Sequence, residues 1–499
     1  MKKYALLFVL ALITVLAFST TTSPIYSGQE GFDSAIFKTM GLAVLEGKTP
    51  YVDIFDHKGP VLYFINALGQ AIIPGSLGIF ILQILSLFAV FLFMYQSARL
   101  FVGPLQSGVL MGLGVLLLFV TMQGGNLCEE WELLAVAPAL YACLLYQRSD
   151  LSKRRSFRIG CILGAAFAFC FFIRPNDAVS LPGGMAFGLF LFLLAEKRFE
   201  SLLPYILSFV LGLVAVTLPI FLYFASRGAL DGLYYGLIGH NLLYSGGLFA
   251  SEGMGKRLVL LTFCLLTLFL LHKTKRRNLS LLVGPVLLLF TLLVGKNFFA
   301  HYLTVLIPIV LLCAAVLFST RRVWGYASYL AAAVVMVCVS FLYVDTLHLR
   351  LRNHAQYDCY KESRRMLGRI PEEERSQIWN FNLGFASDGF QYVSVFCHNR
   401  LVPMNRVLLY NMVFIDPSLA RSEDVAQSKP LWVLLTHADD MLAYPQGKSS
   451  GQLYEFFQPG YDFIEANYER VDCADATLCD LELWRRKDRE NPVIIEDIQ

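Results

Sequence analysis

Of the 499 residues, 56% are hydrophobic and only 16% are charged, against about 25% charged residues in soluble proteins, which excludes an ordinary soluble globule. The charged residues are divided unevenly, with 39 in residues 1–349 and 40 in residues 350–499, so we expect a transmembrane domain followed by a soluble domain with these bounds. The net charge of +3, without a long run of Lys or Arg, excludes a nucleic-acid partner.

Apolar stretches of about 20 residues, the length that crosses a bilayer, recur along the first domain. Eleven helices are predicted, over residues 4–22, 76–96, 105–121, 132–147, 158–173, 179–195, 203–225, 257–272, 279–295, 300–318 and 325–344. The first stretch also fits a signal peptide, but its length and the lack of a clear A-x-A site favour a retained helix. The expected fold class is an all-α polytopic membrane bundle of about 11 transmembrane helices.

Basic residues determine the expected orientation. With Lys2 and Lys3 inside the cell, every short inner loop is basic, as the positive-inside rule requires. Twelve of the fifteen Asp and Glu residues before residue 350 then lie at or beyond the outer face. We therefore expect a multi-pass protein of the cytoplasmic (inner) membrane whose C-terminal domain is extracytoplasmic.

The C-terminal domain, residues 350–499, has the pattern of a mixed α/β domain. Residues 377–381 and 431–436 resemble short strands, whereas residues 361–369 and 371–377 favour helices. The domain contains Cys359, Cys397, Cys473 and Cys479. Outside the cytoplasm these cysteines could form one or two disulfides, and their spacing does not define the pairing.

The predicted first outer loop, residues 23–61, holds many of the candidate site residues. It contains GFDSAIF and then EGKTPYVDIFDHKGP, which brings a His-Lys pair to the membrane surface. Its candidate residues are Asp33, Asp53, Asp56, His57 and Lys58. A solvated connector would hold such charges in surface salt bridges of little energetic value. Ionisable residues at membrane depth instead favour a functional site.

A second acidic stretch, GGNLCEEWELLAVAP, begins at residue 124. On a helix, the adjacent Glu129 and Glu130 point about 100° apart, so they can serve different partners. They could orient an acceptor, bind a divalent cation or pair with a cation of another loop. Acidic residues at a helix N-terminus also have a purely structural explanation in the helix dipole. The sequence leaves the use of a metal ion open.

A third group of polar residues falls at the same predicted face. Its members are Arg174, His240, Asn241, Lys296, His301 and Tyr302. Cations that line a cavity at the lipid boundary suit an anionic phosphate group. We assign Lys58 and this group to the donor phosphate, except for His240 and Asn241, which we assign to an acceptor or donor pocket. A single Arg more commonly extends to the interface, so the clustering is what favours a site.

The order of these motifs resembles the GT-C glycosyltransferases, especially bacterial relatives of the protein O-mannosyltransferases and aminoarabinose transferases. The resemblance covers residues 1–320 and is carried by Asp33, the G-x-x-P-Y-x-D-x-x-D-H-K-G-P element, the acidic motif and the late His-Tyr pair. It implies a sugar donor on polyprenyl phosphate, transfer outside the cytoplasm, usually with inversion, and Asp33 as the general base. Many relatives carry a second acid directly after this Asp, where this chain has Ser34.

The expected function is the transfer of a hexosyl or pentosyl group to an acceptor hydroxyl on a glycan, lipid or protein. Displacing a phosphate from an anomeric carbon needs a base on one face and positive charge on the leaving group. Asp33 can supply the base. Five further residues are assigned to its support or to acceptor orientation, namely Asp53, Asp56, His57, Glu129 and Glu130.

The alternatives are a transporter or flippase of lipid-linked sugars, whose paired repeats we do not find, and a membrane protein that acts by binding a partner through its C-terminal domain.

Overall fold

The computed structural model describes residues 2–26, 30–244, 300–319, 355–381, 393–408, 416, 418–436, 450–475 and 481–488. The predicted helices at residues 257–272, 279–295 and 325–344, and the predicted boundary between residues 349 and 350, lie outside this part of the chain. The other eight predicted stretches are helical. The count of eleven membrane helices therefore stays a prediction.

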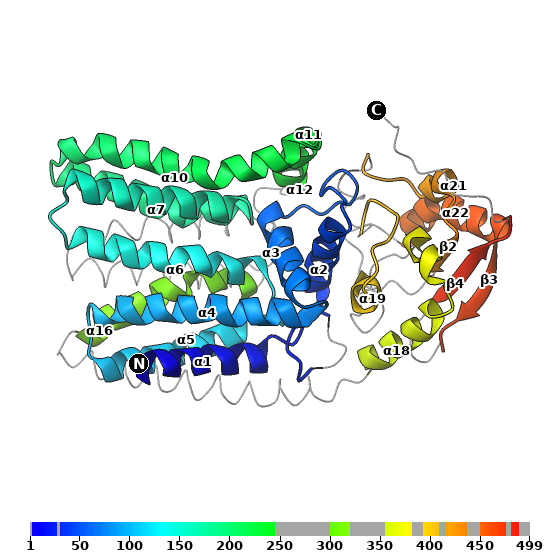
Figure 1. Cartoon of the computed structure of the whole chain (residues 1–499), viewed down its shortest axis with the longest axis horizontal. Coiled ribbons are helices and arrows are strands. Elements are labelled where there is room, and N and C mark those ends of the chain that lie inside the picture. Colours follow the sequence, from blue (N-terminus) through cyan, green and yellow to red (C-terminus); the bar gives the residue numbers. More distant parts are fainter. Residues whose placement is uncertain are drawn as a thin grey trace.

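The first domain is a bundle of roughly parallel and antiparallel helices (Figure 1). They are α1 (Lys2–Phe18), α4 (Ser76–Arg99), α5 (Pro104–Thr121), α6 (Cys128–Gln147), α7 (Lys153–Phe171), α8 (Pro175–Ser180), α9 (Pro182–Ala195), α10 (Phe199–Ala225), η3 (Ala300–Leu306) and α16 (Ile307–Ser319). Among the described residues, four segments are long and apolar enough to cross a membrane, namely α4, α5, the combined α8 and α9, and α10.

Two apolar cores hold the bundle together, and α6 belongs to both. One core joins α6 to α1, α4, α5 and α16, and the other joins it to α7, α9, α10 and α16. The helices α7 and α10 pack closely, because Gly160, Gly164 and Gly212 let the two backbones touch. Such small residues are common where membrane helices pack, because they allow more van der Waals contact.

The predicted first outer loop is more ordered than a connector. It folds into α2 (Phe32–Leu45) and α3 (Pro60–Ile72), which lie between the bundle and the C-terminal domain (Figure 1). Pro60 suits the first turn of α3, where its missing N–H has no helical partner. The helix α2 is not evident from the sequence because residues 34–43 are all buried, so no amphipathic stripe marks it. It is stabilised by burial against α3 and the C-terminal domain. Three short helices, α11 (Leu230–Tyr234), η1 (Tyr235–Gly239) and α12 (His240–Tyr244), follow α10.

The C-terminal domain contains a four-stranded sheet in the order β1-β2-β4-β3. Its strands are β1 (Ile378–Phe381), β2 (Trp432–Leu435), β3 (Tyr468–Cys473) and β4 (Glu482–Arg486), and its helices are α18 (Ala355–Leu367), η4 (Glu372–Gln377), α19 (Val393–Asn399), α21 (Asp424–Ser428) and α22 (Ser450–Asn467). β1 and β2 are parallel, and the other pairs are antiparallel. The two predicted strands are thus confirmed.

The cysteines of the C-terminal domain do not pair with one another in the described residues. Of the described cysteines in this domain, Cys397 and Cys473 are free thiols, and Cys479 lies outside the described residues. An apolar cluster instead joins this domain to the first one, because residues of α2 and α3 pack with residues of β1, β2, α19 and α22. The two domains therefore share an apolar core around α2 and α3.

Candidate functional site

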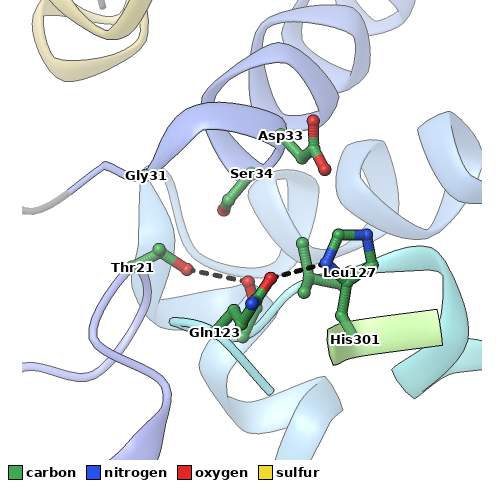
Figure 2. Close-up of a pocket in the computed structure, with 8 residues that line it drawn as sticks. Thr21, Gly31, Asp33, Ser34, Gln123, Leu127 and His301 are labelled. Atoms are coloured by element: carbon green, nitrogen blue, oxygen red, sulfur yellow. Dashed lines mark hydrogen bonds between the residues drawn. The ribbon is translucent and has the colours of Figure 1, made fainter. Parts of the chain in front are cut away.

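A small pocket of about 90 Å³ opens where α2 begins, beside the end of α5 and the start of η3 (Figure 2). It is lined by Thr21, Gly31, Asp33, Ser34, Gln123, Gly125, Leu127 and His301. Two residues predicted from the sequence, Asp33 and His301, therefore share one cavity although they are far apart in the chain. His301 Nδ1 lies 2.6 Å from Gln123 Oε1 across the pocket floor.

A glycine turn between α5 and α6 forms one wall of the pocket. Gly124 and Gly125 have φ angles of 102° and 81°, a left-handed conformation that glycine adopts without steric cost. The backbone N–H of Thr21 donates to Gly124 O at 3.1 Å, and its hydroxyl donates to Gly125 O at 3.2 Å. A Cβ at Gly125 would collide with Ser19. The glycines of the predicted acidic motif thus let this turn bind the segment that follows α1.

Asp33 lies in the first turn of α2, on the side of the pocket that faces His301 (Figure 2). Burial raises the pKa of its carboxyl, while Lys58 and, when it is protonated, His301 act in the opposite direction. Glu129 and Asp56 add to the rise. A carboxylate with a raised pKa binds a proton more strongly, which suits a general base.

The D-H-K segment before α3 is fixed by two tyrosines. The hydroxyl of Tyr51 donates to Lys58 O at 2.6 Å, and that of Tyr63 lies 2.8 Å from both Lys58 O and Asp56 Oδ2. Burial would raise the pKa of Asp56, but His57 and Lys58 lower it to about 2. Burial and Lys58 lower the pKa of His57 to about 4. His57 is therefore neutral at pH 7, and its Nε2 lies 3.2 Å from Lys58 Nζ.

Arg174, which precedes α8, is held by acids and by an aromatic ring. It forms an ion pair with Glu129, and its Nη1 lies 3.3 Å from Asp177 Oδ2. The guanidinium carbon lies 3.9 Å from the centre of the Tyr302 ring, within the range of a cation–π interaction. Arg174 and Tyr302, which the sequence places in one group, are therefore in direct contact, and Glu129 of the acidic motif pairs with a cation of another loop.

Glu130 has different partners from Glu129, in agreement with the expected 100° separation. Gln83 Nε2 donates to both oxygens of Glu130 at 2.9 and 3.0 Å. The backbone N–H of Asn126 donates to Glu130 Oε2 at 2.8 Å. Glu129 faces the cations of the site, whereas Glu130 binds α4 and the glycine turn.

The remaining predicted site residues surround the D-H-K segment and do not line the pocket. Asp53 is exposed between α2 and α3. His240 is fully buried with its ring centre 5.6 Å from that of His57, and Asn241 Nδ2 donates to His57 O at 2.8 Å. Their places suit support of the D-H-K segment. Lys296 lies outside the described residues.

Sequence reasoning missed a buried charge cluster that joins α2 to the C-terminal domain. Lys38 Nζ lies 2.6 Å from Glu30 Oε2, and His398 Nδ1 lies 3.4 Å from Glu30 Oε1. The thiol of Cys397 donates to Glu30 Oε2 at 3.4 Å. The available signal was Lys38, a lone charge in the apolar run AIFKTMGLAV, because a buried charge needs a partner.

A second set of contacts joins the C-terminal domain to the segment between α2 and α3. Phe55 N donates to Arg406 O at 2.7 Å, and Arg406 Nη2 donates to Tyr51 O at 2.7 Å. Lys48 Nζ donates to Pro403 O at 2.8 Å. The C-terminal domain therefore holds both the helix that carries Asp33 and the segment that leads to Lys58.

Replacing Glu30 by Gln is expected to weaken this attachment in a pH-dependent way. Lys38 and His398 lower the pKa of Glu30 to about 2, against an ordinary 4.5, although burial opposes the change. The charged carboxylate therefore stabilises the folded protein above about pH 4.5, by up to about 3 kcal/mol, and this contribution is lost as the pH falls toward 2.

Thermal unfolding in detergent checks this expectation. Glu30→Gln should unfold several degrees below the wild-type protein at pH 7, and the two should converge as the pH is lowered. Glu372→Gln, at an exposed position in the first turn of η4, is the matched control and should behave like the wild-type protein. A difference between Glu30→Gln and wild type that does not change with pH would contradict the assignment.

The described residues contain no group of three or more His, Cys, Asp or Glu side chains arranged to hold a metal ion. The acids of the site instead bind protein groups, since Glu129 pairs with Arg174 and Glu130 with Gln83.

No protein-family model and no curated protein sequence matches the chain, but solved structures do. ArnT from Cupriavidus metallidurans bound to undecaprenyl phosphate superposes with a TM-score of 0.61 at 11% identity, over 97% of this chain and 98% of that one. The apo state of ArnT gives a TM-score of 0.60 at 12% identity with the same coverage. This chain has the GT-C fold. The oligosaccharyltransferase of Archaeoglobus fulgidus in the apo form also matches, with a TM-score of 0.52 at 12% identity, over 95% of this chain and 80% of that one.

The GT-C fold predicted from the sequence motifs is thereby confirmed. The match extends well beyond residue 320, where the sequence resemblance ends, because it covers 97% of the chain. Both the helical bundle and the C-terminal domain therefore belong to the shared GT-C architecture.

Proposed function

We propose that the protein is an integral membrane glycosyltransferase that moves a sugar from a polyprenyl-phosphate donor to an acceptor hydroxyl. The observation that carries the proposal is the placement of Asp33 beside Lys58, Glu129 and His301 at one end of an apolar helix bundle. ArnT, which shares the fold, has been solved with undecaprenyl phosphate bound. An enzyme that uses such a lipid needs both an apolar bundle and a charged site at its edge.

The donor phosphate is expected to bind at Lys58. Arg174 already has Glu129 and Asp177 as counter-ions. In the part of the chain that the structure describes, the partly buried Lys58 takes part in no ion pair and contacts neutral His57. Lys58 acts electrostatically on Asp33 and Asp56, and a phosphate at Lys58 Nζ would add a direct charge-assisted hydrogen bond.

Transfer then proceeds as a single displacement. Asp33 accepts the proton of the acceptor hydroxyl, whose oxygen forms a bond to the anomeric carbon of the sugar. The bond between that carbon and the phosphate oxygen breaks, and polyprenyl phosphate leaves with the bonding electrons. Lys58 offsets the negative charge that develops on the leaving oxygen, and the sequence assigns Lys296, His301 and Arg174 to the same donor phosphate. Attack from the face opposite the phosphate inverts the anomeric centre.

The proposed site faces the outside of the cytoplasmic membrane. The helix α2, which carries Asp33, and the C-terminal domain lie at one end of the bundle, and the basic start of α7 lies at the other (Figure 1). Basic loops mark the cytoplasmic side. The isoprenoid chain can then lie among the helices while its phosphate reaches the pocket. We retain residues 1–349 as the transmembrane domain and residues 350–499 as the extracytoplasmic domain.

The direct test uses the purified full-length protein with a panel of polyprenyl-phosphate sugars and with envelope glycans, lipids or proteins as acceptors. We expect release of polyprenyl phosphate from one donor, accompanied by labelling of one acceptor class. Repeating the assay with a chelator determines whether a metal ion takes part. Movement of the intact lipid-linked sugar across proteoliposomes without phosphate release would instead favour the transporter alternative.

A further inference from the structure

Asn126 lies where the three elements that carry the proposed site meet. Asp33 is on α2, Lys58 directly precedes the Gly-Pro start of α3, and Glu129 is on α6. Asn126 is fully buried, and its φ of 57° places it in the left-handed region, which Asn adopts more readily than most residues. It ends the glycine turn between α5 and α6.

The carboxamide of Asn126 binds all three helices at once. Its Nδ2 donates to Ser34 Oγ of α2 at 3.0 Å and to Asn66 Oδ1 of α3 at 2.9 Å. Its Oδ1 accepts from Trp131 Nε1 of α6 at 3.0 Å. Because an indole N–H can only donate, Oδ1 must face Trp131, and both amide hydrogens must then face α2 and α3. The amide group has no spare donor.

Further contacts leave these helices little freedom to shift. The backbone N–H of Asn126 donates to Glu130, which Gln83 binds from α4. α2 and α3 are in direct contact at Gly41 and Asn66. A Cβ at Gly41 would lie only 2.8 Å from the carbonyl carbon of Asn66, so only glycine fits there. The Asn126 carboxamide links α2 and α3 by its bonds to Asn66 and to Ser34, the residue next to Asp33.

We propose that Asn126 is a positioning residue that sets the separation between Asp33 and the donor phosphate at Lys58. It acts through neighbours, since Ser34 adjoins Asp33 in sequence and Asn66 lies in the helix that Lys58 leads into. The inference rests on the proposed function and concerns the same site. Small displacements of reacting groups are costly, since a shift of about 1 Å can lower a rate about 100-fold.

The test compares the full-length wild-type protein with Asn126→Gly, which keeps the left-handed backbone accessible and removes the side chain with its carboxamide. Hydrogen–deuterium exchange should become faster in α2 and α3 and stay unchanged in β1 to β4. With the donor found active for the wild-type protein, kcat should fall about 100-fold, while the donor KM stays close to wild type. Trp131→Phe, which removes one of the three bonds, should give an intermediate loss of kcat.

The matched control is Asn467→Ala in α22, where the amide bonds only Phe463 O at an exposed site; it should leave kcat unchanged. Unchanged exchange in α2 and α3 of Asn126→Gly would overturn the proposal, as would a loss of activity that equals the loss of folded protein. Faster exchange in α2 and α3 together with no transfer by the wild-type protein from any donor would support the positioning of the helices and refute the proposed function.

Discussion

Replacing Asp33 by Asn is expected to lower the rate of sugar transfer by about 100- to 10,000-fold, the usual contribution of a general base. Asn has nearly the same shape as Asp but cannot accept the proton of the acceptor hydroxyl. Binding of the donor should therefore persist. The measurement pairs the release of polyprenyl phosphate with equilibrium binding of the same lipid-linked sugar.

Asp231→Asn provides a matched control, because Asp231 is an exposed acid in the first turn of α11. It should transfer sugar at the wild-type rate. Full transfer by Asp33→Asn would refute the assignment of Asp33 as the base. Equal loss of donor binding and transfer would assign Asp33 to the binding of the donor instead.

The pH dependence of transfer offers a second check on Asp33. A general base works when it is deprotonated, so kcat/KM should rise with pH through the pKa of Asp33. Burial raises this pKa, so the acid limb should lie above the ordinary value of 3.8 for aspartate. Asp56, with a pKa of about 2, would place the limb below 3.8. The position of the limb therefore distinguishes the two carboxylates.

The sequence could indicate Asp33, Lys58, Glu129 and Arg174 because charge is rare and costly in an apolar chain. A charged residue next to a membrane helix stands out against 56% hydrophobic residues. The structure brings these residues close enough to interact electrostatically. Charge at membrane depth was thus a sufficient signal for the ionic part of the site.

Neutral and long-range contacts gave no such signal. Asn126 is uncharged, and its partner Ser34 lies 92 positions away. Glu30 and His398 are separated by 368 positions, so nothing near Glu30 in the sequence shows that it is buried. The helix α2 was not predicted for the same reason, because the residues that cover its apolar surface come from α3 and from the distant C-terminal domain.

The C-terminal domain has a more direct role than its sequence suggests. A mixed α/β domain outside the membrane could simply cover the site and select acceptors. The structure shows instead that His398 contacts Glu30, the ion-pair partner of Lys38 on α2. Arg406 and Pro403 bind the segment that follows α2. Removing the domain would expose the apolar cluster that it shares with α2 and α3. We therefore expect transfer to require both domains on one chain.

Replacing Lys58 by Met is expected to lower kcat/KM by about 100- to 1,000-fold, the usual cost of removing one group that stabilises developing negative charge. Met keeps most of the side-chain volume and removes the ammonium. Lys58→Arg should retain part of the activity, because it keeps the charge but changes its geometry. Lys361→Met, at an exposed site on α18, should transfer at the wild-type rate.

The contrast with Arg174 makes the Lys58 prediction specific. Arg174→Met leaves the buried Glu129 and Asp177 without their shared cation, so it should first lower stability, as expected when one partner of a buried ion pair is removed. Lys58→Met leaves no ion-paired acid behind among the described residues, so its melting temperature should stay near that of the wild-type protein. If Lys58→Met also unfolds early, or binds polyprenyl phosphate as tightly as the wild-type protein, Lys58 does not hold the donor phosphate.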